Sequence, residues 1–339
     1  MLSFSNGVIN VKILVLSTGG TITSIKTNEG LKPNNSSFIV DFLKSVDHNS
    51  IFDYYELFTL DSSNIQPEEW QSLALKVYNS IPNYDGIIIT HGTDTMAYTS
   101  SMLSFMIQNP SIPIVFTGSQ LPIYEELTDA YSNLRYALAM AKSQLPGIYL
   151  AFNRKIMLGC RAVKVRTTSF FAFESINLKY AAQIDSRGLI VDNSVIHKSK
   201  NTNECNVNIE TNVFLLKITP TTNPSIIDLL IDSGIKGIVI EAYGAGGISF
   251  IRRNFIDYIT KATKNNIPIC VCSQCLYEEA NFNIYEVGKK AIESGVIEAL
   301  DMTTESAVTK LMWCLGQTND LNEIKQLFRT NLAGEINIK

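Results

Sequence analysis

Two short glycine-containing runs hold the residues of this chain best suited to chemistry. The first is Thr-Gly-Gly-Thr-Ile at 18–22, and the second is His-Gly-Thr-Asp-Thr-Met at 91–96. Each follows an apolar stretch typical of a buried strand, so each places a threonine hydroxyl beside glycine at a strand end. Glycine lets the backbone approach a small ligand closely. A hydroxyl surrounded by amide N–H groups can act as a nucleophile with its own anion hole, so the pair predicts an amide-cleaving enzyme.

Thr21 is the first candidate nucleophile, and the alternative is that it only caps a turn. The run around it lacks the G-x-G-x-x-G spacing of a dinucleotide site and the Gly-Lys-Ser/Thr end of a phosphate loop. The Gly-Ala-Gly-Gly turn at 244–247 also lacks both patterns. We interpret that turn as a strand-to-helix connection.

Thr93 and Asp94 form the second candidate pair. Asp94 could instead cap the helix that follows, although Thr95 could fill that role. His91 is an alternative general base, but a single histidine beside a glycine is more often structural. Lys164 lies between apolar neighbours at 160–165. A lysine is ordinarily a solvated ammonium, but burial favours a neutral amine, which could accept a proton from a threonine hydroxyl. The sequence leaves both states of Lys164 open.

The cysteines do not predict a metal site. Cys270, Cys272 and Cys275 include one Cys-x-x-Cys spacing, but the chain has no second such pair and no histidine nearby, so four ligands cannot be assembled locally. Six cysteines in 339 residues are typical of reduced thiols in a cytoplasmic protein rather than of a disulfide framework.

The composition indicates an ordinary globular protein. Hydrophobic residues make up 45% of the chain and charged residues 18%, with a net charge of −4. We find no basic patch that would favour nucleic-acid binding. The N-terminus lacks the features of a signal peptide, and no apolar stretch is long enough to span a membrane. We therefore expect a cytoplasmic protein without nucleic-acid or membrane partners.

The pattern of predicted elements favours an α/β fold with two domains, each a mainly parallel sheet flanked by helices. Apolar runs predict strands at 11–16, 54–60, 86–90, 113–119 and 147–153, and again at 213–219, 237–243 and 267–273. A helix is expected to begin at Pro67, and another should follow residue 96 and reach about residue 107. Alternating strands and helices predict right-handed βαβ units, with ligands beyond the carboxyl ends of the strands. Thr21, Ser62, Thr93 and Ser119 all fall at such ends.

Two irregular segments complete the prediction. Residues 23–35 are polar and contain Gly30 and Pro33, so we expect a mobile loop there. Residues 196–210 lack either periodicity and predict a linker. The expected domains are therefore 1–195, with the nucleophile loop, and 211–339.

Several motifs in this order resemble those of the L-asparaginases, the bacterial cytosolic type I branch in particular. They are STGGTI, LDSSN from Leu60, DGIIITHGTDTMAYTSSMLSFM from Asp85, VFTGSQLP from Val115, SQC and DMTTESAVTKL. The resemblance runs nearly end to end and implies an asparaginase-like fold with a smaller, flavodoxin-like C-terminal domain. It also implies hydrolysis of L-asparagine to L-aspartate and ammonia without a cofactor or metal.

The resemblance assigns roles to individual residues. It implies that Thr21 accepts the acyl group and that Thr93, Asp94 and Lys164 form a second catalytic group, with Lys164 activating a hydroxyl and Asp94 also binding the substrate ammonium. It further implies that Ser62 and Ser63 bind the substrate carboxylate. Gly20 and Ser119 complete the expected substrate-binding set. Because sites in this family lie between subunits, a homodimer or homotetramer is expected.

The chain departs from the family pattern at three positions. Leu31 stands where many relatives have a loop tyrosine, which leaves Tyr124 or Tyr243 as substitutes. Gly247 stands where relatives often have an asparagine that contacts the substrate ammonium across the interface. Glu241 replaces an arginine that binds an allosteric asparagine in some type I relatives, so that regulation is not expected here.

Two other functions remain as alternatives. Related domains form the ammonia-generating subunit of a tRNA-dependent amidotransferase, which carries an extra N-terminal domain; with a first strand beginning by Val11, we expect no such domain here. The chain could also be a non-catalytic amino-acid-binding module. A module that had lost catalysis would be expected to have lost some of the candidate site residues. All five are present, which argues against this alternative: Thr21, Ser62, Thr93, Asp94 and Lys164.

Overall fold

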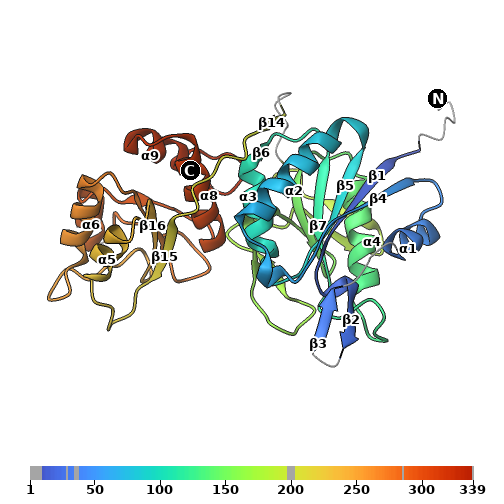
Figure 1. The fold of residues 1–339 in the computed structure, drawn as a ribbon, viewed down its shortest axis with the longest axis horizontal. Coiled ribbons are helices and arrows are strands. Elements are labelled where there is room, and N and C mark those ends of the chain that lie inside the picture. The colour runs from blue at the N-terminus through green and yellow to red at the C-terminus, as the bar shows by residue number, and fades with distance from the viewer. Residues whose placement is uncertain (1–9, 28–29, 34–37, 197–202, 285, 338–339) are drawn as a thin grey trace.

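A computed structural model describes residues 10–27, 30–33, 38–196, 203–284 and 286–337 (Figure 1). The chain forms two α/β units, as the sequence predicts. The larger contains a mixed eight-stranded sheet in the order β13-β12-β9-β8-β7-β5-β1-β4, and the smaller a parallel four-stranded sheet in the order β15-β16-β17-β18. The predicted fold class is confirmed.

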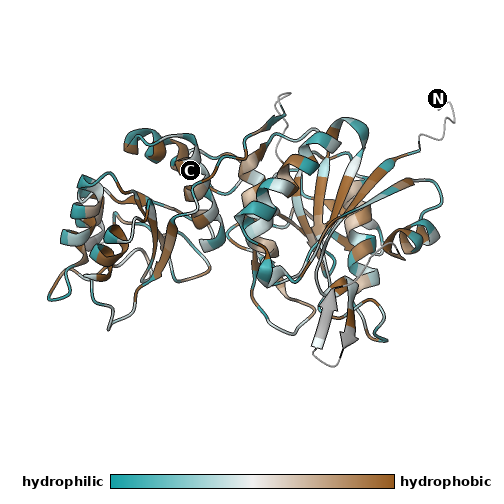
Figure 2. Cartoon of the chain, in the orientation of Figure 1, coloured by the Kyte–Doolittle hydropathy of each residue, from teal (hydrophilic) through white to brown (hydrophobic). Residues whose placement is uncertain are grey.

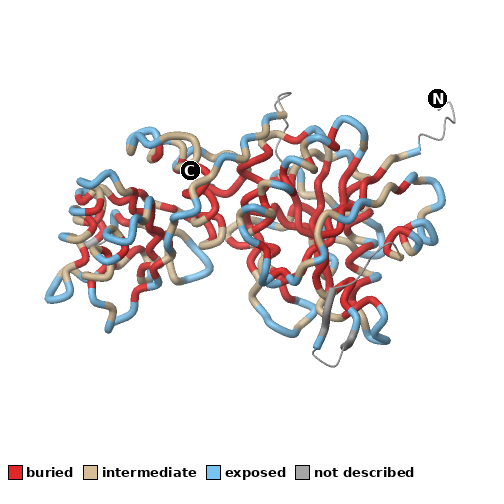
Figure 3. The backbone as a smooth tube through the Cα atoms, in the orientation of Figure 1, coloured by how far each residue is buried: buried red, intermediate tan, exposed pale blue. Residues whose placement is uncertain are grey.

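The parallel half of the large sheet brings together the segments that carry the glycine-containing runs. It consists of β1 (Lys12–Gly19), β4 (Ile51–Leu60), β5 (Gly86–Thr90), β7 (Pro113–Thr117) and β8 (Gly147–Phe152). In β5 and β7 every residue is buried, which explains why these strands read as unbroken apolar runs. Figures 2 and 3 show these apolar, buried strands at the centre of the large unit.

The register of the parallel strands places their carboxyl ends at one edge of the sheet. Gly19 pairs with Leu60, Ser17 with Thr90, and Thr90 with Thr117. The residues that follow these strands therefore meet in space, as expected for an open parallel sheet.

Helices cover both sides of the large sheet. Figure 1 shows α2 (Pro67–Ser80) and α3 (Met96–Met106) on one side and α1 (Phe38–Val46) and α4 (Ala130–Ala141) on the other. Pro67 is the first residue of α2, as predicted, and a reciprocal capping box between Gln66 and Glu69 fixes this helix start.

The antiparallel strands of the large unit extend its sheet and form small hairpins. The sheet continues through β9 (Lys155–Leu158), β12 (Ala182–Asp185) and β13 (Gly188–Val191). A separate pair consists of β10 (Ala162–Lys164) and β11 (Phe173–Ser175).

The segment after Thr21 is not the loop that we predicted. A 3-10 turn at Thr21–Thr23 leads into an antiparallel hairpin of β2 (Ser24–Thr27) and β3 (Gly30–Pro33). Gly30 has a φ of 115°, a conformation that only glycine adopts readily, and it pairs with Thr27 at the turn.

The predicted linker is also more ordered than expected over its described part, residues 203–210. In it, β14 (Glu204–Cys205) pairs with β6 (Ile107–Gln108) at the end of α3. The Gln71 side chain donates to the Val207 carbonyl at 2.9 Å, and Trp313 donates to the Asn206 carbonyl at 3.2 Å. The segment therefore packs against both units.

The small sheet consists of β15 (Val213–Lys217), β16 (Gly237–Ala242), β17 (Ile269–Ser273) and β18 (Ile297–Glu298). Side chains alternate between its two faces. Ile238 and Ile240 of β16 pack with α5 (Ile226–Asp232), α6 (Phe255–Lys264) and α7 (Glu286–Glu293). Val239 instead joins the core that contains Leu311 of α8 (Thr304–Gln317).

Helix α8 joins the two units. Its buried side chains belong to the same hydrophobic core as those of α3, so the large unit and one face of the small sheet share one core. The last helix, α9 (Leu321–Arg329), packs against α8, and the chain then turns back toward the large unit. Lys310 of α8 forms a fully buried ion pair with Glu335 in this last segment.

Breaking this ion pair should destabilise the protein strongly. Burial alone would raise the pKa of Glu335, but Lys310 and the N–H groups of Leu332 and Ala333 outweigh it, so the pKa lies below 4.5. The pair therefore stabilises the fold above about pH 4.5, and this stability is lost as pH falls through the folded pKa. We expect Lys310→Met, which leaves Glu335 unpaired, to cost about 3–5 kcal/mol at pH 7.

Urea unfolding of Lys310→Met and wild type between pH 3 and pH 7 measures this effect. The difference in unfolding free energy should shrink as the pH falls. A difference below about 1 kcal/mol at pH 7 would contradict a stabilising role for the pair, because that is the range of an exposed ion pair.

Candidate active site

The carboxyl ends of three strands pack backbone against backbone through glycine. Gly20 has a φ of 83°, and a Cβ atom there would lie 2.3 Å from the Gly92 nitrogen. A Cβ atom on Gly92 would in turn lie 2.5 Å from the Ser62 hydroxyl oxygen. The two glycines thus allow the backbone before Thr21 to lie against the turn before Thr93, and that turn to lie against Ser62.

Gly20→Ala is therefore expected to damage both the fold and the site. The added methyl meets backbone atoms that cannot turn away, and the backbone conformation of Gly20, with φ 83° and ψ 179°, is one that essentially only glycine adopts and that costs other residues about 1–3 kcal/mol. Gly234→Ala is the matched control, because Gly234 has a similar φ of 89° but no atom within 4 Å of where its Cβ would lie. Thermal melting should show a larger loss for Gly20→Ala. Equal losses of melting temperature in the two variants would mean that backbone strain alone, and not close packing, explains why position 20 requires glycine.

Thr93, Asp94 and Lys164 converge, as the resemblance implies. The Lys164 Nζ atom donates to Thr93 Oγ1 at 2.8 Å and to Asp94 Oδ1 at 2.6 Å. The Lys164 side chain is 17% exposed, whereas the Asp94 side chain is 64% exposed. An amine that is mostly shielded from water and in direct contact with a hydroxyl can exchange a proton with it.

The secondary-structure elements that carry these three residues explain why they meet, although Asp94 and Lys164 are 70 positions apart in the sequence. Thr93 and Asp94 lie in the turn between β5 and α3, so they project from the carboxyl end of a central strand. Lys164 is the last residue of β10, where it pairs with Phe173 of β11. The β10–β11 hairpin therefore carries the amine to the edge of the large sheet.

Gln120 is a site residue that we did not predict. Thr93 Oγ1 donates to Gln120 Oε1 at 3.3 Å, and the Gln120 amide donates to the carbonyls of Thr167 and Ser169 at 2.9 Å and 3.1 Å. Gln120 thus links the Thr93 hydroxyl to the turn between β10 and β11. Its position directly after Ser119, beyond the end of β7, is the sequence signal that could have identified it.

Asp129 fixes the backbone at Gln120. Its carboxylate accepts hydrogen bonds from the N–H groups of Gln120 and Leu121 and from the Asn133 side chain. Burial raises the pKa of Asp129, and these donors offset part of that effect.

The predicted carboxylate-binding serines lie at the same edge. Ser62 is buried, and its hydroxyl accepts the Asp94 N–H at 3.2 Å, which links the end of β4 to the turn after β5. Ser63 donates to Asp61 at 2.7 Å and is exposed. Ser119 is buried and donates to the Leu121 carbonyl, so its hydroxyl proton is already engaged.

Thr21 begins the 3-10 turn directly after the close contact between Gly20 and Gly92. Its side chain is half-buried, and among the described residues its hydroxyl forms no hydrogen bond. The carbonyl of Gly20 accepts the hydroxyls of Thr23 and Ser24 at 3.2 Å and 3.0 Å, which holds the turn in place.

His91 has the burial and contacts of a structural residue. It is 1% exposed, its Nδ1 atom lies 2.7 Å from the Gly92 carbonyl, and its ring packs against Phe116. Burial lowers the pKa of His91 to about 4. The imidazole is therefore neutral at pH 7 and bonded to its own backbone turn.

The cysteines differ in how far they are buried. Cys270 and Cys272 are buried on β17, Cys275 is exposed, and all six are free. Over the part of the chain that the structure describes, no group of histidine, cysteine and carboxylate side chains could hold a metal ion. The same residues include no helix long and apolar enough to cross a membrane.

Two family models match most of the chain. "Asparaginase, N-terminal" matches residues 12–197, and "Glutaminase/Asparaginase C-terminal domain" matches residues 212–328. The chain belongs to the asparaginase/glutaminase family. The predicted resemblance to the asparaginases is thus confirmed at the level of the family, for both the N-terminal and the C-terminal part of the chain.

Individual asparaginase-family relatives cover nearly the whole chain. An L-asparaginase of Thermococcus kodakarensis is 43% identical over 96% of this chain and 99% of its own length. The structure of the thermostable L-asparaginase from that organism has a TM-score of 0.90 over 97% of this chain and 100% of its own. L-asparaginase I from Vibrio cholerae has a TM-score of 0.86 at 26% identity, over 97% of this chain and 100% of its own.

One further relative has a different activity in its name. A glutamyl-tRNA(Gln) amidotransferase subunit of Methanosphaera stadtmanae is 37% identical over 95% of this chain and 76% of its own length.

The three departures from the family pattern occupy defined places. Leu31 lies in β3, with its side chain outside the described residues. Gly247 pairs with Tyr243 in the turn after β16. Glu241 accepts from Thr304 at 2.7 Å and pairs with Lys217 at 3.3 Å, so its carboxylate is engaged within the chain.

Proposed function

We propose that this protein hydrolyses L-asparagine to L-aspartate and ammonia. The observation that carries the proposal is the 2.8 Å contact between Lys164 Nζ and Thr93 Oγ1, with Asp94 bonded to the same amine. The 43% identity to an L-asparaginase over nearly the full chain supports the same reaction.

In the proposed mechanism a threonine hydroxyl attacks the side-chain amide carbon. Thr21 forms the acyl-enzyme: its oxygen bonds to the amide carbon, and its hydroxyl proton passes to the amide nitrogen, which leaves as ammonia. In the second step neutral Lys164 accepts the Thr93 proton as Thr93 accepts a proton from the attacking water, and the pair returns one proton to the Thr21 oxygen as the ester bond breaks. Water then attacks the ester, releases L-aspartate and restores Thr21.

The substrate is a zwitterion, and the proposed site offers a group for each of its charges. Asp94, with its exposed carboxylate, binds the ammonium. Ser62 donates to the α-carboxylate, Ser63 does so once its hydroxyl turns from Asp61, and Gly20 and Ser119 complete the proposed substrate-binding set. Backbone N–H groups near Thr93 stabilise the oxyanion, an arrangement for which each strong donor contributes about 3–4 kcal/mol.

An assay of the purified chain with L-asparagine and L-glutamine, side by side, tests the proposal. We expect equal amounts of ammonia and aspartate from asparagine, without added metal, tRNA or partner protein. Glutamine is one methylene longer, so a rate difference of about 10- to 200-fold between the two amides is expected. Absence of ammonia from both amides would refute the proposed hydrolysis.

A second candidate is the ammonia-generating subunit of a tRNA-dependent amidotransferase. It is favoured by the 37% identity to a glutamyl-tRNA(Gln) amidotransferase subunit, but that likeness is lower than the likeness to the L-asparaginase. Activity that appears only with tRNA and a partner subunit would favour it. Binding of aspartate without hydrolysis of either amide would favour a non-catalytic binding module instead.

We further propose that the protein belongs to the type I branch and acts in the cytoplasm as a homodimer or homotetramer. The similarity to L-asparaginase I from Vibrio cholerae supports the branch. A bacterial origin is not proposed, because the 43% relative is archaeal. Light scattering of the purified chain, with and without asparagine, measures the oligomeric state.

A further inference from the structure

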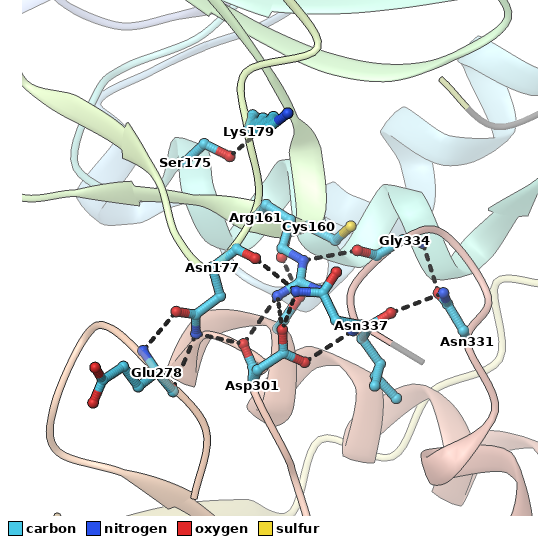
Figure 4. A network of polar contacts seen from close by, with 12 residues as sticks. Cys160, Arg161, Ser175, Asn177, Lys179, Glu278, Asp301, Asn331, Gly334 and Asn337 are labelled. Carbon is cyan, nitrogen blue, oxygen red and sulfur yellow. Dashed lines mark hydrogen bonds and ion pairs between the residues drawn. The ribbon is translucent and has the colours of Figure 1, made fainter. Parts of the chain in front are cut away.

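Arg161 connects the segment in front of Lys164 to the end of the chain. Its side chain is fully buried, and Nε donates to the Gly334 carbonyl at 2.7 Å. Its Nη1 atom donates to the carbonyl of Asp301 at 2.9 Å and to the Asp301 carboxylate at 3.0 Å. Figure 4 shows the guanidinium between these two partners, of which Gly334 lies 173 positions away along the chain.

Asp301 is held from several sides, so it is a fixed partner for Arg161. The Asn337 backbone N–H donates to one carboxylate oxygen at 3.0 Å, and the Asn337 side chain donates to the other at 2.7 Å. The Asn177 amide, just beyond β11, donates to the Asp301 carbonyl at 2.9 Å. Asp301 therefore binds Arg161, the end of the chain and the β10–β11 hairpin together.

The end of the chain is itself folded into a defined shape. We refer to residues 330–337 as the C-terminal tail. Within it, the Gly334 N–H donates to Asn331 at 2.8 Å, and the buried Glu335 carboxylate accepts the N–H groups of Leu332 and Ala333. The ion pair from Glu335 to Lys310 attaches this loop to α8. The tail thus presents the Gly334 carbonyl to Arg161 from a rigid support.

The position of Lys164 depends on how the start of its strand is held. Strand β10 has three residues, and among the described strands it pairs only with β11. The Gly159 carbonyl accepts the Ser100 hydroxyl of α3 at 2.9 Å, and the Cys160 carbonyl accepts the Ser306 hydroxyl of α8 at 2.7 Å. Gly159, Cys160 and Arg161 thus anchor the start of the strand. Only Arg161 does so through a charged side chain, and it lies directly before β10.

We propose that Arg161 is a positioning residue for Lys164, and that the C-terminal tail with Asp301 forms its support. The inference rests on the proposed function, because it concerns how the amine is held against Thr93. Loss of the guanidinium frees the start of β10, and a displacement of about 1 Å at a reacting group can lower a rate by about 100-fold. Ser62 and Ser63 at the end of β4, which bind the substrate carboxylate in the proposed site, bond to Asp94 and Asp61 and not to β10, so the loss falls mainly on kcat.

Steady-state kinetics of Arg161→Gln, Arg161→Lys and Asn337→Ala on L-asparagine tests this proposal. We expect kcat to fall by about 10- to 100-fold in Arg161→Gln, with KM within about threefold of wild type. Arg161→Lys should recover part of the loss, because it keeps a cation beside Asp301 but cannot also reach Gly334. Asn337→Ala, an exposed change that weakens the support, should lower kcat less.

A control separates positioning from general stability. Ile259→Val trims the core of the small unit, far from the tail network, and lowers the melting temperature without a contact to β10. It should keep wild-type kcat. The positioning role is overturned if Arg161→Gln keeps wild-type kcat. It is also overturned if Ile259→Val loses as much kcat as Arg161→Gln when the two variants show the same drop in melting temperature.

Two further outcomes are also decisive. If Arg161→Gln does not fold, the kcat of Asn337→Ala decides, and a value equal to wild type overturns the proposal. A wild-type protein that releases no ammonia from asparagine would instead refute the proposed function.

Discussion

Replacing Thr21 by alanine is expected to lower ammonia release from L-asparagine at least about 1,000-fold while the protein stays folded. Loss of a nucleophile removes the covalent route altogether, and in enzymes whose groups act as a unit the loss can reach about a millionfold. The Thr21 hydroxyl has no hydrogen bond among the described residues, so its removal leaves none of those residues without a partner.

The measurement is ammonia release together with thermal melting. Thr260→Ala is the matched control, because it removes a threonine hydroxyl that bonds to the Ile256 carbonyl within α6. That variant should keep wild-type activity. A Thr21→Ala protein with near-normal turnover would remove Thr21 from the mechanism and leave Thr93 as the remaining candidate nucleophile.

Lys164→Met is expected to reduce kcat by about 100- to 10,000-fold. The change removes the group that accepts the proton from Thr93, and a positioned general base contributes about that much to a rate. Methionine keeps a side chain of similar length, so packing around the 17% exposed lysine should change little.

Lys261→Met provides the control for this substitution. Lys261 also pairs with an aspartate, Asp228 at 2.9 Å, but on the surface of the small unit. It should keep wild-type activity and nearly wild-type stability, because exposed ion pairs contribute little. If Lys164→Met were as active as Lys261→Met, the amine would have no part in catalysis.

The sequence predicted the meeting point of the strand ends well, for a physical reason. In a parallel sheet the carboxyl ends of all strands share one edge, so the residues after β1, β4, β5 and β7 must approach one another. The strands themselves were readable from residue type, because they are buried apolar runs, whereas their order in the sheet was not predicted.

Other parts of the site were not readable in this way. Lys164 lies on a short hairpin outside the parallel sheet, and only the family resemblance assigned it a role. Gln120 follows the end of β7, but its residue type gave no reason to prefer it to Ser119 as a site residue, and its bond to Thr93 is seen only in the fold. Arg161 meets Gly334 across 173 positions, a contact set by how α8 joins the two units. Within the predicted loop at 23–35, the described residues 24–27 and 30–33 instead form a hairpin, because strand pairing overrode their polar composition.

The most direct test of the central claim is a double-mutant cycle between Thr93 and Lys164. We predict that Thr93→Ala with Lys164→Met is no slower than the slower single variant, because the hydroxyl and the amine 2.8 Å apart act as one unit. Rate losses that multiply independently in the double variant would contradict the claim that these two groups work together on the amide.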